Sequence, residues 1–261
     1  VGNNGLGVVG VNWKVSLVPL QVAKPNNLVS SSAVLLAIQW AIERWGTSEQ
    51  IDIINYSISG FGSSTAEREI LKDYKGLFVW AAGNDDTNLD EMIKFFGTFN
   101  LPNLISVGAL KSDNTRPSAA DWGYDDNGNP HGSNYSSDGT NVHIYAPGDR
   151  ILSTVLNNGY GSKFGTSMAA PFVTGVAALL LSVAPELTAT QLKQAILDGS
   201  DSIDILTPEG TKQTVKRLNA HKVLKVLSKD TSGYYIEKIY QNYSMENNIS
   251  VSTRCLRLDG S

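Results

Sequence analysis

Cysteine is almost absent from this sequence, which has one thiol, Cys255, among 261 residues. A single cysteine excludes an internal disulfide, and it excludes a metal centre built from several thiolates. Charge of one sign is also lacking, because 21 Lys and Arg stand against 25 Asp and Glu, for a formal net charge of −4. The sequence has no basic stripe, and we therefore expect no nucleic acid among its partners.

Long uninterrupted apolar runs are scarce as well. The longest, Met168–Ala184, is broken by Pro171, Thr174, Gly175 and Ser182. A membrane-spanning helix needs about 20 consecutive, mostly apolar residues. The sequence therefore predicts a buried helix at this place and no membrane span.

Apolar, β-rich runs alternate along the chain with helical patterns. Several of these runs are continuous, which is typical of parallel strands covered on both faces. The expected strands are Val15–Val22, Ile51–Tyr56, Leu77–Ala82, Leu104–Val107 and Val142–Tyr145, and the expected helices are Ser32–Trp45, Ala66–Lys75 and Thr188–Leu197. The last helix begins with capping-box spacing between Thr188 and Gln191. The alternation predicts an α/β fold, a doubly wound and mainly parallel sheet flanked by helices, with ligands beyond the carboxyl ends of its strands.

The domain organisation follows from length and composition. With 41% hydrophobic residues, residues 1–227 are long enough to form one large α/β domain. After Leu227 the sequence is polar and rich in tyrosine, so we expect residues 228–261 to be a C-terminal extension of unknown role. The opening, Val1–Gly5, lacks a Met and the features of a secretory leader, which indicates a cut inside a longer protein.

Two short motifs suggest ligands but lack the required context. Gly5–Gly10 matches G-x-G-x-x-G, yet a dinucleotide site needs a strand before this motif and a helix after it, so we interpret the segment as a glycine-rich loop. Asp125, Asn127 and Asn129 have the alternate spacing of a calcium loop. Pro130 stands where an EF-hand needs glycine, which excludes that motif and leaves only a looser calcium contact open.

The segment Gly165–Val173 puts a serine at the start of an apolar helix. At this place the Ser167 hydroxyl would lie near the free N–H groups and the positive end of the helix. An alkoxide or oxyanion that forms there would be stabilised. The pattern alone equally allows a simpler role, in which Ser167 caps the helix.

A second segment, Leu77–Asn84, ends a predicted buried strand on an asparagine. We expect Asn84 at the edge of the ligand crevice, where its amide can donate a hydrogen bond to a developing oxyanion. A turn-forming asparagine is the alternative that the pattern leaves open.

These two segments together carry a family resemblance. Gly165–Pro171 closely resembles the G-T-S-M-A-x-P nucleophile motif of the subtilisin-like serine proteases (subtilases), and Ala81–Asn84 resembles their oxyanion-hole motif A-A-G-N. Further matches are Gly2–Val11 with the calcium-binding loop, Ile54–Gly60 with the substrate strand, Ala146–Gly148 with a family turn, and Arg217–Ala220 with the closing R-x-N-A. The resemblance covers about residues 1 to 227, in the family's order.

The resemblance implies the roles of the site residues. Ser167 would be the nucleophile, and the side-chain amide of Asn84 would donate to the oxyanion together with the backbone N–H of Ser167. The substrate-binding residues would be Ser57, Ile58, Ser59, Gly60, Ala81 and Gly83. The family usually has Gly where this chain has Ser59, a departure that bears on the pocket for the residue before the scissile bond.

A structural calcium ion is implied in the same way. Its ligands would be the side chain of Asn4 and the carbonyl groups of Gly2, Leu6 and Val8. The resemblance also implies a polypeptide substrate and an extracellular or cell-surface location.

The Asp and His that subtilases need precede the asparagine loop with which this chain opens. The histidines present, His131, His143 and His221, do not lie in the family's context. We therefore expect an N-terminal segment of the same precursor to carry both residues, while this chain lacks the N-terminal strand and the His helix. Each buried backbone group left without a partner costs about 1–3 kcal/mol. We predict that the isolated chain is inactive and does not form the native domain.

The leading hypothesis is a serine endopeptidase that hydrolyses peptide bonds through an acyl-enzyme at Ser167. The alternative is a catalytically inactive subtilase-like domain that serves as a binding or scaffolding module. The presence of both Ser167 and Asn84 favours the enzyme. An α/β-hydrolase esterase is disfavoured, because Ala169 stands where the motif G-x-S-x-G needs its last glycine.

Overall fold

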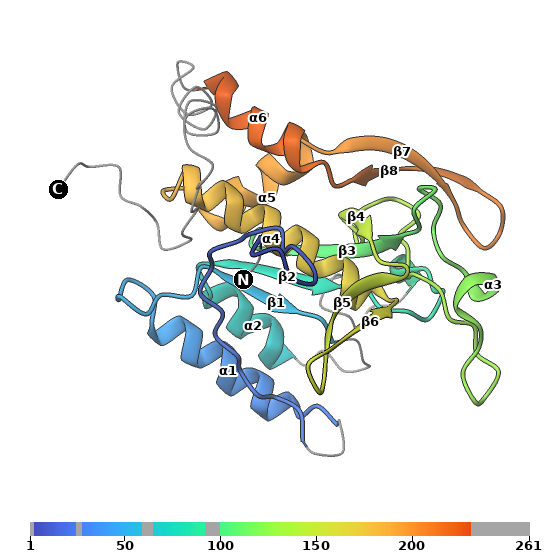
Figure 1. Ribbon diagram of the computed structural model, residues 1–261, viewed down its shortest axis with the longest axis horizontal. Helices are drawn as coiled ribbons and strands as arrows, with labels where there is room; N and C mark the ends of the chain where they lie inside the picture. The colour runs from blue at the N-terminus through green and yellow to red at the C-terminus, as the bar shows by residue number, and fades with distance from the viewer. Residues whose placement is uncertain (1–2, 25–27, 59–64, 92–99, 231–261) are drawn as a thin grey trace.

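The computed structural model describes residues 3–24, 28–58, 65–91 and 100–230 (Figure 1). The helices are α1 (Ser31–Glu43), α2 (Thr65–Asp73), α3 (Ala119–Trp122), α4 (Thr166–Val183), α5 (Ala189–Asp198) and α6 (Ala220–Asp230), with a 3-10 turn η1 (Leu89–Glu91). The strands are β1 (Ile53–Tyr56), β2 (Leu77–Ala81), β3 (Leu104–Leu110), β4 (Ile144–Pro147), β5 (Ile151–Val155), β6 (Gly159–Lys163), β7 (Asp201–Leu206) and β8 (Lys212–Arg217). The predictions for Gly2, Ser59, Gly60 and the extension from residue 231 onward lie outside the described residues.

Six of the strands form one sheet in the order β1-β2-β3-β4-β8-β7. Neighbours from β1 to β4 pair in parallel, as do β4 and β8, whereas β7 and β8 form an antiparallel hairpin at one edge. β5 and β6 form a separate antiparallel hairpin. The predicted α/β fold with a mainly parallel sheet is confirmed.

Helices cover both faces of the sheet, with α1 and α2 on one side and α4, α5 and α6 on the other (Figure 1). The central strand β2 shows how the sequence supplies both cores, because every one of its residues is buried. Leu77, Val79 and Ala81 belong to the cluster under α4 and α5. Phe78 and Trp80 belong to the cluster under α1 and α2. A continuous apolar run is therefore what a strand between two layers of helices needs.

The strands predicted at 51–56, 77–82, 104–107 and 142–145 are confirmed as β1, β2, β3 and β4, and the helices predicted at 32–45, 66–75 and 188–197 as α1, α2 and α5. The predicted capping box of α5 is present: Thr188 Oγ1 accepts from the Gln191 N–H, and Gln191 Oε1 accepts from the Thr188 N–H at 2.9 Å. The glycine-rich segment Gly5–Gly10 is a loop, as expected.

The strand predicted at Val15–Val22 is wrong. No residue of this segment belongs to a strand, and only isolated bridges flank it, at Lys14 and between Ala23 and Val29. Leu17 and Val18 are 72% and 48% exposed. An apolar run favours a strand, but a strand forms only beside a chain that satisfies its N–H and C=O groups. In the described part of the chain, no strand lies beside this segment.

Helix α4 crosses the sheet and carries the expected buried segment. By length and composition it is the one helix within the described ranges that is long and apolar enough to cross a membrane. One face of α4 packs onto the sheet, where Ala169, Val173, Val176, Ala177 and Leu180 are buried. The helix thus serves as the central element of one core.

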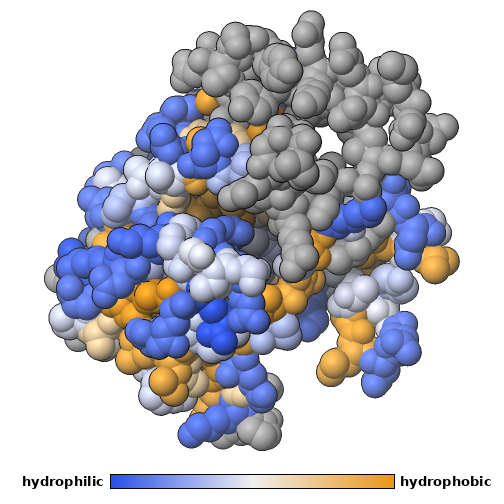
Figure 2. Space-filling view, turned by 90° about the vertical axis from the view of Figure 1, so that its left-hand side faces the viewer, coloured by the Kyte–Doolittle hydropathy of each residue, from blue (hydrophilic) through white to orange (hydrophobic). Residues whose placement is uncertain are grey.

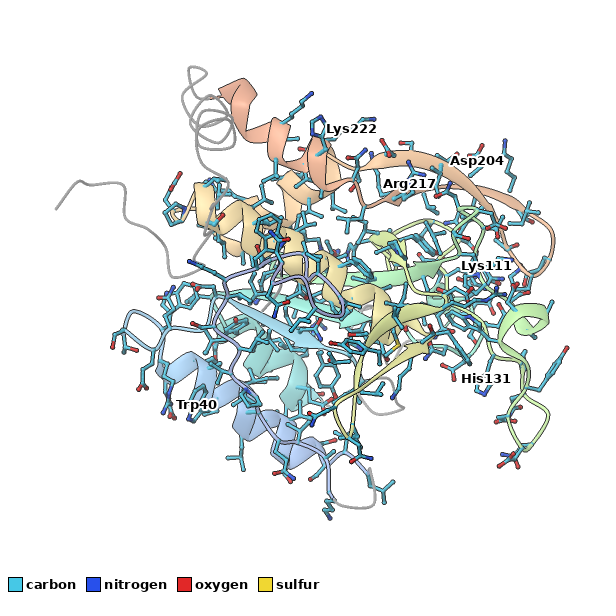
Figure 3. All side chains as sticks on the ribbon, in the orientation of Figure 1. Trp40, Lys111, His131, Asp204, Arg217 and Lys222 are labelled. Atoms are coloured by element: carbon cyan, nitrogen blue, oxygen red, sulfur yellow. The ribbon has the colours of Figure 1, made fainter. Side chains whose placement is uncertain are left out.

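Asp201, the first residue of β7, explains the motif Arg217–Ala220. Its carboxylate accepts hydrogen bonds from Lys222 Nζ at 2.5 Å, Arg217 Nη2 at 2.6 Å and Asn219 Nδ2 at 3.0 Å. Arg217 and Lys222 are both labelled near the top of Figure 3, on β8 and α6. The bonds from Lys222, and then from Arg217, hold the pKa of Asp201 far below its usual range. The motif fastens α6 to the β7–β8 hairpin.

Candidate active site

Ser167 is the second residue of α4, and it does not cap the helix. The N-cap is Gly165, at φ 136° and ψ 159°, and no side chain accepts a capping hydrogen bond there. The capping role that the sequence left open for Ser167 is therefore wrong. Its hydroxyl donates instead to the carbonyl oxygen of Ser57, over 3.1 Å. The hydroxyl lies in the first turn of an 18-residue helix, where the partial positive charge of the helix favours a developing anion.

Ser57 follows β1 directly, and its contact with Ser167 runs in both directions. Ser57 Oγ donates to the carbonyl oxygen of Ser167 over 2.9 Å. In a regular helix that carbonyl would accept from the N–H of residue 171, but Pro171 has none. The proline thus frees an acceptor within α4, and the residue after β1 occupies it. Asn55 Nδ2, which donates to Ser57 Oγ over 2.9 Å, holds the serine from the other side.

Asn84 follows β2 and faces the same turn of α4. Its Oδ1 accepts from the backbone N–H of Thr166 at 2.8 Å and from Thr166 Oγ1 at 3.0 Å. Because a backbone N–H can only donate, the accepting atom must be the amide oxygen. The amide nitrogen Nδ2 is left as a donor beside Gly165, 3.3 Å from the position that a Cβ on this glycine would take. The hydroxyl of Thr166 also accepts from the Gly83 N–H at 3.0 Å, which ties the loop to the helix.

The carboxyl ends of β1 and β2 and the first turn of α4 thus bring Ser57, Asn84 and Ser167 together. Ala81 ends β2 and is fully buried, and Gly83 lies in the loop that leads to Asn84. Ile58 follows Ser57, and its carbonyl oxygen accepts from Trp80 Nε1 at 3.3 Å. The arrangement brings a hydroxyl, a backbone N–H at a helix start and a primary amide to the same end of the sheet. A nucleophile and hydrogen-bond donors of this kind are the groups that addition to a carbonyl group requires.

The histidines do not supply a base to this crevice. His131, labelled in Figure 3, belongs to the loop after α3, and its Nδ1 lies 3.4 Å from the carbonyl oxygen of Asn84. His143 is partly buried, and its Nδ1 accepts from the Ser106 N–H at 2.9 Å. His221 is in the first turn of α6. Within the described ranges, Ser167 Oγ contacts none of the three.

The predicted calcium loop is exposed at its described residues. Asn4 Oδ1 accepts from the Leu6 N–H at 3.1 Å, so this side-chain oxygen is turned into the loop. Leu6 is 73% exposed and Val8 is partly buried. The proposed donors are all oxygen atoms, the type that Ca²⁺ prefers, so their chemistry fits this ion.

The second stretch considered for calcium, around Asp125, uses its carboxylate internally. Asp125 Oδ1 accepts from the N–H groups of Asn127 and Asn129, each at 2.8 Å. Bonds from Asn129, through its side chain and then its backbone, lower the pKa of Asp125. The alternate spacing thus builds a tight turn.

Two residues that support the site carried no sequence prediction. Thr166, which orients the carboxamide of Asn84, lies inside the recognised motif beside Ser167, so its position was available as a signal. Asn134, which contacts the loop around Asn84, lies in a polar stretch of Asn, Gly and Ser, a composition typical of a surface loop. It is fully buried.

Comparison with known proteins gives a consistent picture. Residues 1–224 match the sequence profile of the subtilase family. Subtilisin DY of Bacillus licheniformis is 33% identical over 201 residues, and subtilisin E of Bacillus subtilis (strain 168) is 32% identical over 196 residues. Both alignments cover 74% of this chain, but 64% and 46% of the respective relative. The chain spans about half to two thirds of the length of these relatives.

Solved structures show the same likeness. A cold-adapted subtilisin-like serine proteinase superposes with a TM-score of 0.60 at 26% identity, over 77% of this chain and 65% of the other. A protease of Pseudoalteromonas arctica PAMC 21717 superposes with a TM-score of 0.68 at 26% identity, over 86% and 66% of the two chains.

Proposed function

The chain belongs to the subtilase family, and on that premise we propose that it is the Ser-bearing part of a serine endopeptidase. One observation carries the proposal: the amide oxygen of Asn84 accepts two hydrogen bonds from Thr166, the residue directly before Ser167 in the first turn of α4. This leaves an amide N–H group and a backbone N–H beside the serine hydroxyl. Two such donors are what a tetrahedral oxyanion needs.

In the proposed reaction, Ser167 Oγ attacks the carbonyl carbon of a peptide bond. Its proton passes to a base, the carbonyl oxygen becomes an oxyanion, and Asn84 Nδ2 and the Ser167 N–H donate to it. Collapse breaks the C–N bond, the base returns the proton to the leaving amine, and water hydrolyses the ester at Ser167. The Ser57 carbonyl can accept a hydrogen bond from Oγ but cannot take its proton, and a serine hydroxyl without a base is a poor nucleophile.

The substrate is proposed to lie extended along the segment that follows β1. Ser57, Ile58, Ser59 and Gly60 would pair with its backbone, and Ala81 and Gly83 would line the pocket before the scissile bond. The support for Ser57 is its position at the end of β1 and its contact with Ser167. An extended peptide gains affinity from such main-chain pairing.

We further propose that an N-terminal segment of the same precursor supplies the Asp and His. β1 is the last strand of the sheet on its side within the described ranges. Beside β1 lies a cavity of about 1090 Å³, and residues of the extended segment Val15–Val22 and of α1 and α4 form its other walls. We infer that one upstream strand enters this cavity between β1 and Val15–Val22.

The direction of that strand links it to the chemistry. Carboxyl ends of parallel strands meet at one edge of a sheet. Ser57, directly after β1, already contacts Ser167 in both directions. A strand that enters parallel to β1 would therefore end close to Ser167, where an Asp can hold a His base.

Calcium and location complete the proposal. A structural calcium ion would be held by Asn4, through its side chain, and by the carbonyl groups of Gly2, Leu6 and Val8. We place the protein outside the cell or at its surface, by family resemblance.

If calcium binds at the loop that contains Asn4, a chelator should lower the melting temperature of the complete protein. Asn4→Ala should abolish that calcium dependence, while Gln39→Ala on the exposed face of α1 should keep it.

A fluorophosphonate probe tests the enzymatic proposal. In the complete protein, with its upstream segment, we expect stoichiometric labelling at Ser167 that Ser167→Ala abolishes. Ser153→Ala, at an exposed serine of β5, is the matched control and should label normally. Absence of labelling in the complete folded protein would refute the endopeptidase and favour the inactive scaffolding domain.

A further inference from the structure

We propose that Asn134 is a positioning residue for the oxyanion-binding amide of Asn84, an inference that rests on the proposed function. Asn134 does not face the crevice and touches none of the reacting atoms. Its side chain instead fixes the short loop between β2 and η1, on which Asn84 is carried.

The side chain of Asn134 is fully buried and uses all of its hydrogen-bonding capacity on this loop. Its Oδ1 accepts from the N–H groups of Asp85 at 2.9 Å and Thr87 at 3.0 Å. Its Nδ2 donates to the carbonyl oxygen of Ala82 at 3.0 Å and to Asp85 Oδ2 at 3.3 Å. A primary amide has two donors and an oxygen with two lone pairs, so every one is used. The bonded backbone groups lie on both sides of Asn84.

Backbone bonds from the same segment hold the two residues that lie between. The Asn134 N–H donates to the carbonyl oxygen of Gly83, and the Gly132 N–H donates to that of Asn84, each over 3.0 Å. Gly83 has φ +103°, and a Cβ there would collide with the Asn134 amide nitrogen. Only glycine fits this backbone conformation and lets Asn134 approach so closely. From Ala82 to Thr87, the loop is thus bound along its length by one short segment.

The segment that holds the loop is itself fixed to the core. Ser133 is fully buried, and its Oγ accepts from the N–H of Ala109 in the buried strand β3 at 2.9 Å. Arg116 donates to the Ser133 carbonyl oxygen and also forms a buried ion pair with Asp86, inside the loop. Through the segment that contains Ser133 and Asn134, the loop around Asn84 is therefore held at a fixed place relative to β3.

Thr166 and Asn134 divide the task of holding Asn84. Thr166 holds the side-chain oxygen, and Asn134 holds the backbone to which that side chain belongs. An oxyanion donor acts only at a defined place, and a misplacement of about 1 Å can cost about 10²-fold in rate. Because the oxyanion exists only in the transition state and intermediate, such a loss falls on kcat and spares KM.

The test is a double-mutant cycle on kcat in the complete protein, with active sites counted by the fluorophosphonate probe. Asn134→Ala should lower kcat about 10- to 100-fold, against a KM change below about threefold. In the Asn84→Ala background the same change should lower kcat by less than about threefold, because the donor that Asn134 positions is gone.

Asn103→Ala is the matched control. Asn103 is also buried, and its Nδ2 donates to the carbonyl oxygens of Leu71 at 2.8 Å and Tyr74 at 2.7 Å, at the amino end of β3, away from Ser167. This variant should lower stability and leave kcat per active site unchanged. If Asn134→Ala does not fold, Asn134→Asp takes its place in the cycle. The aspartate keeps the oxygen that accepts from Asp85 and Thr87 but loses the amide group that donates to Ala82.

The outcomes separate the two proposals. If Asn84→Ala leaves kcat unchanged, the role of Asn84 is wrong, and the proposed function fails at that point. If Asn84→Ala lowers kcat but Asn134→Ala behaves like Asn103→Ala, the positioning role is refuted. An equal loss of kcat from Asn134→Ala in both backgrounds also refutes it, because Asn134 would then act independently of Asn84.

Discussion

Thr166 decides which atom of the Asn84 carboxamide faces the crevice. Its N–H and its hydroxyl both donate to the amide oxygen, and its hydroxyl also accepts from the N–H of Gly83. The residue is fully buried, so no water replaces these bonds easily. A single side chain thus sets both the rotamer of Asn84 and the distance from its loop to α4.

We predict that Thr166→Val lowers kcat about tenfold while KM changes little. Valine keeps the shape and the backbone N–H but loses the hydroxyl, which leaves the Gly83 N–H buried without an acceptor. Thr166→Ser keeps the hydroxyl and should retain most of the activity. Steady-state kinetics on a peptide substrate compare the variants, and equal kcat values for valine and serine would contradict the role given to the hydroxyl.

His143 and Lys193 form a partly buried pair, and their hydrogen bonds show where the proton of the neutral imidazole lies. His143 Nδ1 accepts from the Ser106 N–H, so the proton of the neutral ring is on Nε2, 3.0 Å from Lys193 Nζ. The Nε2–H can be accepted only by the uncharged amine of Lys193, so the protonated, charged amine opposes this contact. Burial, and then the charge of Lys193, lower the pKa of His143 to about 3, and burial lowers the pKa of Lys193 to about 8.

This pair makes stability depend on pH. Between about pH 8 and the ordinary lysine pKa of 10.5, the unfolded state binds more protons at Lys193 than the folded state, so stability rises with pH in this window. Below pH 8 the folded protein is penalised by at most about 3 kcal/mol. Lys193→Met should therefore raise the free energy of unfolding at pH 7 and have a smaller effect at pH 10. Urea unfolding of the complete protein measures both, and an effect of the same size at both pH values would rule out the ionisation.

Residue chemistry made part of the site predictable. Ser167 and Asn84 could be found because each follows a recognisable local pattern, a serine before an apolar helix and an asparagine after a buried strand. Asn134 could not, because its partners lie 47 to 52 positions away and its own surroundings in the sequence are those of a surface loop. A residue that acts through long-range bonds to the backbone leaves no local signal.

At the scale of elements, β1 and α4 are joined through a helix defect. Pro171 removes the hydrogen bond that the Ser167 carbonyl would otherwise accept, and Ser57 Oγ replaces it at 2.9 Å. A second hydrogen bond joins the same two residues, because Ser167 Oγ donates to the carbonyl oxygen of Ser57. The proline is thus a condition for the contact between strand and helix.

Two mutations test whether the hydrogen bond from Ser57 Oγ replaces the helical bond that Pro171 cannot make. Ser57→Ala should lower the free energy of unfolding by about 1 kcal/mol, because the Ser167 carbonyl loses its donor. Pro171→Ala supplies a backbone N–H within α4, so it should recover part of this loss in the double variant. Chemical denaturation of the complete protein gives the four values. Additive effects would show that the two residues do not share the carbonyl.

Elements were predictable where the signal and the packing agree. The continuous apolar runs of β2 and β3 gave a reliable prediction because both faces of these strands are covered. The hairpin of β7 and β8 was missed, since its polar residues alternate with apolar ones and its single apolar face is short. Val15–Val22 has the composition of a strand without a neighbour to pair with. Whether a segment pairs depends on the neighbouring strands of the sheet, and the composition of the segment alone does not show whether such a neighbour exists.

At the scale of the molecule, apolar surface remains uncovered. Leu17, Leu28 and Leu36 are 72%, 64% and 70% exposed. Figure 2, which views the molecule from the left-hand side of Figure 1, shows hydrophobic surface interspersed with hydrophilic surface on this face. Leu17 also lines the cavity beside β1, so the upstream strand proposed above would cover this side chain.

We predict that the isolated 261-residue chain does not fold cooperatively. Among the described residues, no strand covers the outer side of β1, and a cavity lies beside it. The backbone groups and apolar side chains there would lose stability, against a typical domain stability of about 5–15 kcal/mol. Hydrogen exchange should show weak protection of β1 in the chain alone and strong protection after the upstream segment is added. A cooperative unfolding transition with native-like protection in the chain alone would overturn this prediction.

Within the described ranges no strand pairs with the outer side of β1, and this has a consequence for the synthesis of the protein. A strand with unsatisfied N–H and C=O groups is a template on which other copies assemble, and its apolar surroundings make such assemblies hard to reverse. Ribosomal synthesis runs from the amino terminus, so an upstream strand would leave the ribosome before β1. Order of synthesis alone would then shield the sheet from aggregation, and expression from the middle of the gene would forfeit that protection and yield inclusion bodies.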